Sequence, residues 1–114
     1  MNFIYQDPKK FKHFLLELPE KDRVKLLHTI SNIEKYGYAV AQKMGWTKKL
    51  DNNLYEIRSK FSSNIQRGIY FHLENNDYVI THGFTKKTQV TPKKEIKKAK
   101  QLRIDYLRHK HAGR

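Results

Sequence analysis

The sequence predicts an α+β fold in which helices pack on one face of a small sheet. Two N-terminal segments repeat apolar residues at helical spacing, and a third such segment lies near the C-terminus. Between them lie short runs of β-branched and aromatic residues, separated by turn-forming residues. This order within 114 residues predicts a single domain over residues 1–108, with a flexible tail at 109–114.

The N-terminal part predicts a short strand followed by two helices. Residues 2–5 are apolar and favour an edge strand. Asp7 and Pro8 then start a helix, because aspartate caps free amide groups and proline fits the first turn. A second helix opens at Pro19 and stops at Gly37. The apolar stripes of the two helices consist of Phe11, Phe14, Leu15 and Leu18, and of Leu26, Ile30 and Ile33.

The middle of the chain predicts three strands, at 54–58, 65–73 and 78–84. Short turn segments at 62–64 and 75–77 separate them, and connections this short imply antiparallel hairpins. Thr91 and Pro92 then open a last helix. The buried side of that helix is marked by Ile96, Ala99, Leu102 and Tyr106.

The chain is strongly basic, with 24 Lys and Arg against 11 Asp and Glu and a net charge of +13. Residues 84–114 contain eleven basic residues and two acidic ones, so they hold most of this charge. A solvated helix face needs no such excess of one sign, which favours a surface that faces a polyanion. A membrane surface is less favoured, because the segment lacks the aromatic and leucine stripe of interfacial helices.

The composition also excludes several classes of protein. The chain has no cysteine, which excludes disulfide scaffolds, zinc ribbons, thiol enzymes and iron–sulfur proteins. No apolar run reaches the roughly 18 residues of a membrane span, and the first residues lack the pattern of a signal peptide. We therefore expect a cytoplasmic protein that contacts no membrane and needs no metal or other cofactor.

A second basic set lies on the expected strands and consists of Arg58, Lys60 and Arg67. Aromatic residues occur between them, and arginine with exposed aromatics fits single-stranded RNA. Strand aromatics are also common in cores, so both interpretations stay open. Strand alternation places Glu56 and Arg58 on one face. It places Arg67 with apolar residues of its own strand, which requires either a bulge or a face of mixed character.

Three motifs in the second half of the chain are recognisable in combination. They are Leu54-Tyr55-Glu56-Ile57-Arg58, then Arg67 with Tyr70, then THGFTKKTQ at 81–89 followed by Thr91-Pro92. Together they resemble the phage-derived HigB-like toxins of the RelE superfamily, and the resemblance extends over about residues 5–106. It implies a RelE-like fold: two N-terminal helices packed on a small, mainly antiparallel sheet, with a C-terminal basic helix.

The resemblance also implies a function, the toxin of a type II toxin–antitoxin pair. Such a toxin is a ribosome-dependent, metal-independent endoribonuclease that cleaves mRNA and inhibits translation. The expected partners are the ribosome, mRNA and a HigA-like antitoxin with a helix-turn-helix domain. The protein would contact DNA only indirectly, through this antitoxin. Cleavage would proceed by attack of the substrate's 2′-hydroxyl on the adjacent phosphate.

The resemblance places the reaction on few residues. It implies that Arg58, Arg67 and Lys86 bind phosphate and stabilise the transition state. Glu56 either accepts the 2′-proton or holds Arg58 in place. His82 has a pKa suited to proton transfer, although a lone histidine in a strand is more often structural. RNA contacts are expected from Lys60, Tyr70, Lys87, Lys93, Lys94 and Lys97.

Two further interpretations remain open. The chain can be a non-catalytic RNA- or ribosome-binding module of the same fold, although the presence of Arg58, Arg67 and Lys86 together favours the enzyme. The basic last helix can also be the docking surface for an acidic antitoxin, which is compatible with either function.

Overall fold

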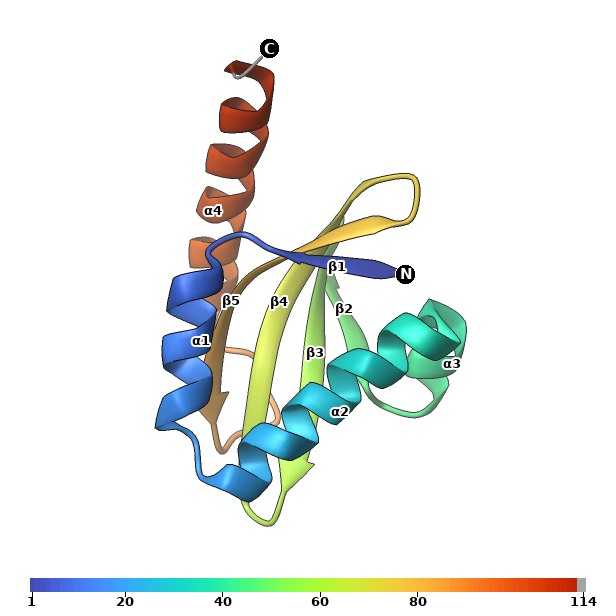
Figure 1. The fold of residues 1–114 in the computed structure, drawn as a ribbon, viewed down its shortest axis with the longest axis vertical. Helices are drawn as coiled ribbons and strands as arrows, with labels where there is room; N and C mark the ends of the chain where they lie inside the picture. The colour runs from blue at the N-terminus through green and yellow to red at the C-terminus, as the bar shows by residue number, and fades with distance from the viewer. Residues whose placement is uncertain (113–114) are drawn as a thin grey trace.

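The computed structural model describes the backbone of residues 1–112 and the side chains of residues 1–110. One five-stranded sheet lies between helices (Figure 1). The elements in chain order are β1 (Asn2–Tyr5), α1 (Pro8–Glu17), α2 (Glu20–Tyr36), α3 (Tyr38–Lys43), β2 (Thr47–Asp51), β3 (Leu54–Phe61), β4 (Asn64–Glu74), β5 (Asp77–Lys86) and α4 (Lys93–Ala112).

The sheet is mixed rather than mainly antiparallel, which corrects the expectation from the sequence. Its strand order is β1-β5-β4-β3-β2, and β1 pairs with β5 in parallel while the other three pairings are antiparallel. The expected meander of three strands is present as β3, β4 and β5. Since β1 and β5 are parallel, the chain must cross over between them, and it does so through the helices and the other strands.

Helices cover both faces of the sheet, whereas the sequence analysis expected them on one. On one face, α1, α2 and α3 surround a core that includes Phe11, Leu26, Ile57 and Tyr70. On the other face, the buried Ala99 of α4 joins a second cluster with strand residues Leu54, Ile69, Phe71, Val79 and Phe84. No helix in the described part of the chain is long and apolar enough to cross a membrane.

The expected helix ends are present where the local signals place them. Asp7 caps α1, and its carboxylate accepts a hydrogen bond of 3.0 Å from the amide of Lys10. Gly37 ends α2 with φ at +86°, a value that glycine adopts without strain, and it leads directly into α3. At the other end of the chain, α4 reaches Ala112 and so includes part of the segment expected to be a flexible tail. Residues 113 and 114 lie outside the described residues.

A face of mixed character explains the position of Arg67. The pairing of β4 with β5 does shift between Ile69 and Tyr70, but the extra residue is Thr81 of β5, so the alternation of β4 is unbroken. Arg67 therefore shares the face toward α4 with Ile69 and Phe71 of the same strand. Apolar residues therefore fill the part of this face under α4, and charged residues occupy the rest.

Two paired glycines give a test of the packing of α1. Gly68 and Gly83 are directly opposite each other on β4 and β5. A Cβ on Gly83 would lie 2.5 Å from the Phe14 ring, whereas a Cβ on Gly68 would meet nothing closer than 3.7 Å. We expect Gly83→Ala to lower the free energy of unfolding by about 1–3 kcal/mol, because α1 must move to admit the methyl group. Urea unfolding measures this, with Gly68→Ala as the matched control; equal effects of the two substitutions would contradict this account.

Candidate functional site

Strand register gathers four basic residues at one end of the sheet. On the face toward α4, Arg58 is opposite Arg67, while Lys60 and Lys86 flank Ile65 in the next row. We call this group, Arg58, Lys60, Arg67 and Lys86, the basic end. The helix α4 leaves it uncovered, because α4 is anchored at the opposite end of the sheet, where Lys110 pairs with Glu74. The loop of residues 87–92 covers the basic end instead.

A buried carboxylate holds the basic end together. Glu56 and Arg67 are both fully buried. One oxygen of Glu56, Oε1, accepts a hydrogen bond from Nε of Arg58. The other oxygen, Oε2, accepts a hydrogen bond of 2.6 Å from the hydroxyl of Thr91 and lies 3.6 Å from Nη1 of Arg67. A single carboxylate thus pairs with two arginines on neighbouring strands and binds Thr91, two residues before α4 begins.

The loop accepts hydrogen bonds from the terminal nitrogens of both guanidinium groups, whereas Nε of Arg67 has no partner among the described residues. Arg67 donates to the carbonyl of Val90 at 3.2 Å and to the carbonyl of Thr88. Arg58 donates to the carbonyl of Gln89, and its Nη1 lies 3.4 Å from Oε1 of that side chain. Three successive loop carbonyls are therefore bound by two arginines. Burial lowers the pKa of Arg67, and the charge of Glu56 opposes this shift. Arginine stays protonated in proteins, so Arg67 is a cation paired inside the protein.

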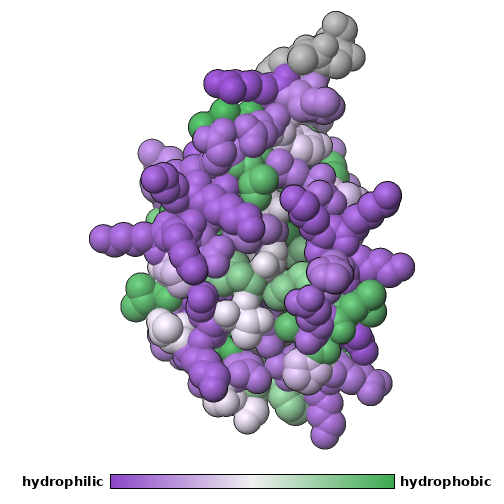
Figure 2. Space-filling view, turned by 90° about the vertical axis from the view of Figure 1, so that its left-hand side faces the viewer, coloured by the Kyte–Doolittle hydropathy of each residue, from purple (hydrophilic) through white to green (hydrophobic). Residues whose placement is uncertain are grey.

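Other basic side chains in and around the basic end are open to solvent, unlike the buried Arg67. Arg58 is partly exposed, Lys86 is half-buried, and Lys60 and Lys87 are exposed. The expected RNA-contacting residues Lys93, Lys94 and Lys97 are exposed on the first turns of α4. Hydrophilic side chains cover much of the side of the molecule that carries α1 and α4 (Figure 2).

The structure does not bring His82 or Tyr70 to the basic end. His82 is opposite Ile69, and its ring contacts Oε1 of Glu95 at 3.1 Å and the hydroxyl of Thr81 at 3.0 Å. Tyr70 is fully buried on the other face of the sheet, with its hydroxyl 2.6 Å from that of Thr47. Burial lowers the pKa of His82 and raises that of Tyr70. Tyr70 is therefore a core residue here and offers no surface for RNA.

Sequence reasoning missed the contribution of the loop. Thr91 was expected only as a helix start, yet it binds Glu56 directly. The carbonyls of Thr88, Gln89 and Val90 left no sequence signal, because every residue has a backbone carbonyl. No group of three or more His, Cys, Asp or Glu side chains within the described residues is arranged to hold a metal ion.

Fold and site together define a small, basic α+β domain with a cationic end on its sheet. The family model described as "Phage derived protein Gp49-like (DUF891)" matches residues 13–103, and the chain belongs to this family. The family is phage-derived and toxin-like, and it is part of the RelE/HigB toxin-like superfamily. No curated protein matches the chain.

Removing the buried carboxylate charge should destabilise the protein strongly. Glu56→Gln leaves the buried Arg67 without its counter-charge, and breaking a buried ion pair in this way costs about 3–5 kcal/mol. The control is Asp51→Asn, which breaks the half-exposed contact to Lys100 and should lower the free energy of unfolding far less. Urea unfolding of both variants measures the difference, and similar losses would show that Glu56 is not the central charge.

The lowered pKa of His82 predicts a pH dependence of stability. The unfolded chain takes up a proton at His82 near pH 6.5, whereas the folded protein does so only at lower pH. His82 therefore contributes to the free energy of unfolding above about pH 6.5, and this contribution is lost as the pH falls below that value. NMR titration should give a midpoint for His82 below 6.5. His82→Gln should reduce the slope of stability between about pH 7 and pH 5, and an unchanged slope would contradict the assignment.

Proposed function

We propose that this chain is the toxin of a type II toxin–antitoxin pair, a HigB-like protein of RelE-like arrangement that cleaves mRNA on the ribosome. The observation that carries the proposal is the strand register, which places Arg58, Arg67 and Lys86 at one end of one sheet face. Membership of a toxin-like family supports it. A surface with several cations side by side suits the phosphates of a nucleic acid better than a small neutral ligand.

The proposed reaction uses the substrate's own nucleophile. The 2′-oxygen forms a bond to the adjacent phosphorus while the bond to the 5′-oxygen breaks. The 5′-oxygen takes a proton from solvent water as it leaves, so the products are a 2′,3′-cyclic phosphate and a 5′-hydroxyl. Negative charge grows on the phosphate oxygens in the transition state, and fixed cations that meet it lower the barrier. Arg58 and Lys86 are assigned to this role, because both lie in the basic end and reach solvent.

Arg67 requires the loop to move before it can contact RNA. The loop carbonyls that hold Arg67 and Arg58 are neutral acceptors, whereas phosphate oxygens are charged acceptors and form stronger hydrogen bonds with a guanidinium. RNA phosphates therefore replace the loop carbonyls in our proposal. When Thr91 leaves with the loop, Oε2 of Glu56 loses its hydroxyl partner and can accept the 2′-proton.

His82 takes part in no step of this proposal, because β4 and Ile69 lie between it and Glu56. The ribosome orients the mRNA, which reduces what the protein itself must position. Lys60, Lys87, Lys93, Lys94 and Lys97 are assigned to backbone contacts with mRNA or ribosomal RNA, since they are exposed around the basic end and along α4. The proposed partner is a HigA-like antitoxin with a helix-turn-helix domain, through which the protein would meet DNA.

One observation favours a second function, a non-catalytic RNA- or ribosome-binding module. Glu56 and Arg67 are fully buried, and the loop occupies the donors of both arginines. If the loop stays in place, only the exposed lysines and part of Arg58 can meet RNA. Binding without cleavage would then result.

Substitutions at the basic end distinguish the two functions. We expect Arg58→Ala and Lys86→Ala each to lower the rate of mRNA cleavage about 10²–10³-fold, because each removes a donor to the developing charge. Lys49→Ala is the control, since Lys49 is exposed on β2 outside the basic end. The measurements are growth after induced expression and mapping of new mRNA 5′ ends, with circular dichroism to verify folding. Growth arrest without new 5′ ends would favour the binding module, and normal growth with intact transcripts would reject the nuclease.

A further inference from the structure

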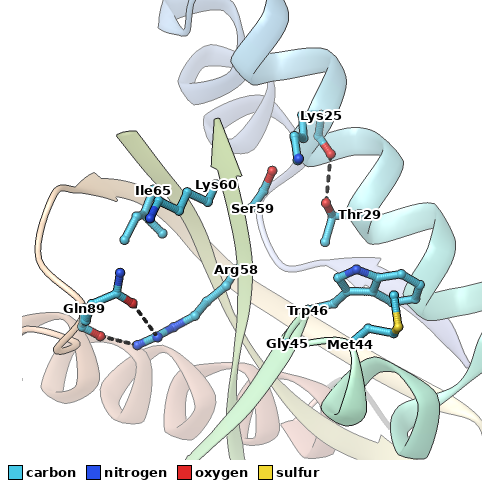
Figure 3. Close-up of a pocket in the computed structure, with 10 residues that line it drawn as sticks. All are labelled: Lys25, Thr29, Met44, Gly45, Trp46, Arg58, Ser59, Lys60, Ile65 and Gln89. Carbon is cyan, nitrogen blue, oxygen red and sulfur yellow. Dashed lines mark hydrogen bonds between the residues drawn. The ribbon is translucent and has the colours of Figure 1, made fainter. Parts of the chain in front are cut away.

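A cavity of about 320 Å³ opens beside the basic end, at the edge of β3. The cavity exists because β2 pairs only with residues 54–57 of β3, so Ser59 and Lys60 have no neighbouring strand on that side. Its walls come from α2, the turn between α3 and β2, the strands β3 and β4, and the loop (Figure 3). The lining residues are Lys25, Thr29, Met44, Gly45, Trp46, Arg58, Ser59, Lys60, Ile65 and Gln89.

The charges around the cavity are all of one sign. Lys25, Arg58 and Lys60 reach it from α2 and β3, and no Asp or Glu is among its described lining residues. In Figure 3, Arg58 extends from the strand toward Gln89, while Lys25 lies on the helix on the other side of the strand. A ligand in this cavity is therefore favoured if it carries negative charge.

An aromatic ring forms another wall. Trp46 is half-buried and packs against the core, with its ring centroid 6.2 Å from that of Tyr36. The side chain of Met44 beside it is largely exposed. An indole ring next to cations is the combination on which single-stranded nucleic acids stack their bases.

A buried hydroxyl supplies an independent observation. Ser59 is 2% exposed, and its Oγ has no hydrogen-bond partner among the described residues although it lines the cavity. Buried hydroxyls almost always have a partner, so this one is available to a polar group that enters the cavity. Gln89 provides an amide on the opposite side of the cavity.

We propose that this cavity binds one unpaired nucleotide of single-stranded RNA, with the base stacked on Trp46 and the flanking phosphates held by Lys25 and Lys60. The proposal rests on the proposed function for the identity of RNA as the ligand. Arg58 borders both the cavity and the Glu56 network, so a base held here places an adjoining phosphate at the basic end. Ser59 and Gln89 bind polar edges of the base.

Trp46 is the only tryptophan of the chain and lines the cavity, so tryptophan fluorescence reports on this one position. The purified protein is titrated with a five-nucleotide single-stranded RNA, with the same backbone lacking its bases, and with a free mononucleotide. We expect saturable quenching by the RNA, and much weaker binding of the abasic strand and of the mononucleotide. No quenching by RNA would overturn the proposal, and equal affinity for the mononucleotide would show a free-nucleotide site instead.

Variants test the same point with labelled RNA and fluorescence anisotropy. Trp46→Ala should weaken binding about 5- to 150-fold, and Trp46→Phe should restore most of it because the phenyl ring still stacks.

The lysine contact has its own test. Lys25→Ala should weaken RNA binding more than Lys21→Ala, its matched control one turn earlier on α2. Melting temperatures identify any variant that fails to fold, and the phenylalanine and lysine variants then decide. Two results together would overturn the cavity assignment: RNA binding that neither Trp46→Phe nor Trp46→Ala changes, and wild-type Trp46 fluorescence that RNA does not alter. mRNA cleavage would keep its own separate test.

Discussion

The carboxylate of Glu56 is the contact on which the α4 side of the molecule depends. Arg67 carries a charge at a position with no exposure to water, and Glu56 is the acidic group that faces it. Burying a guanidinium without such a partner is strongly unfavourable. The same carboxylate binds Arg58 and Thr91, so β3, β4 and the approach to α4 are joined at one point. A single acidic residue therefore determines both where the arginines point and where the loop lies.

The division of one sheet face into core and site follows from where α4 is fixed. Arg103 donates to the carbonyls of Asn52 and Asn53 at 2.9 and 2.7 Å, at the turn between β2 and β3. This end of the sheet is far along the strands from the basic end, so Ala99 and its neighbours cover only the apolar residues. The loop before α4 covers the rest with backbone groups. Arginine can be buried there because carbonyl oxygens are acceptors for its donors.

Periodicity in the sequence was enough to predict the long elements but not the short ones. The stripes around Phe11 and Leu26 predicted α1 and α2, and β-prone runs predicted β1, β3, β4 and β5. The helix α3 has six residues, too few to show a period, and β2 contains two adjacent lysines that resemble a loop. The parallel pairing of β1 with β5 joins residues about seventy-five positions apart, and no local pattern encodes such a pairing.

Within the site, strand alternation did predict the shared face of Glu56 and Arg58. It could not predict the loop contacts, because backbone carbonyls are identical in every residue.

The two groups of cations in this protein differ in what already neutralises them. Arg67 is paired with Glu56 and with loop carbonyls, so a polyanion can bind the Arg67 guanidinium only after the loop contacts are replaced. Lys60 and Lys87 are exposed, and they attract a polyanion without any rearrangement. In our proposal, long-range attraction therefore belongs to the exposed lysines and to α4, whereas selectivity belongs to the exchange of loop carbonyls for phosphate at Arg58 and Arg67. Since Arg58 also borders the cavity beside Trp46, an RNA strand that stacked one base there would bring its next phosphate to the residues at which we propose this exchange.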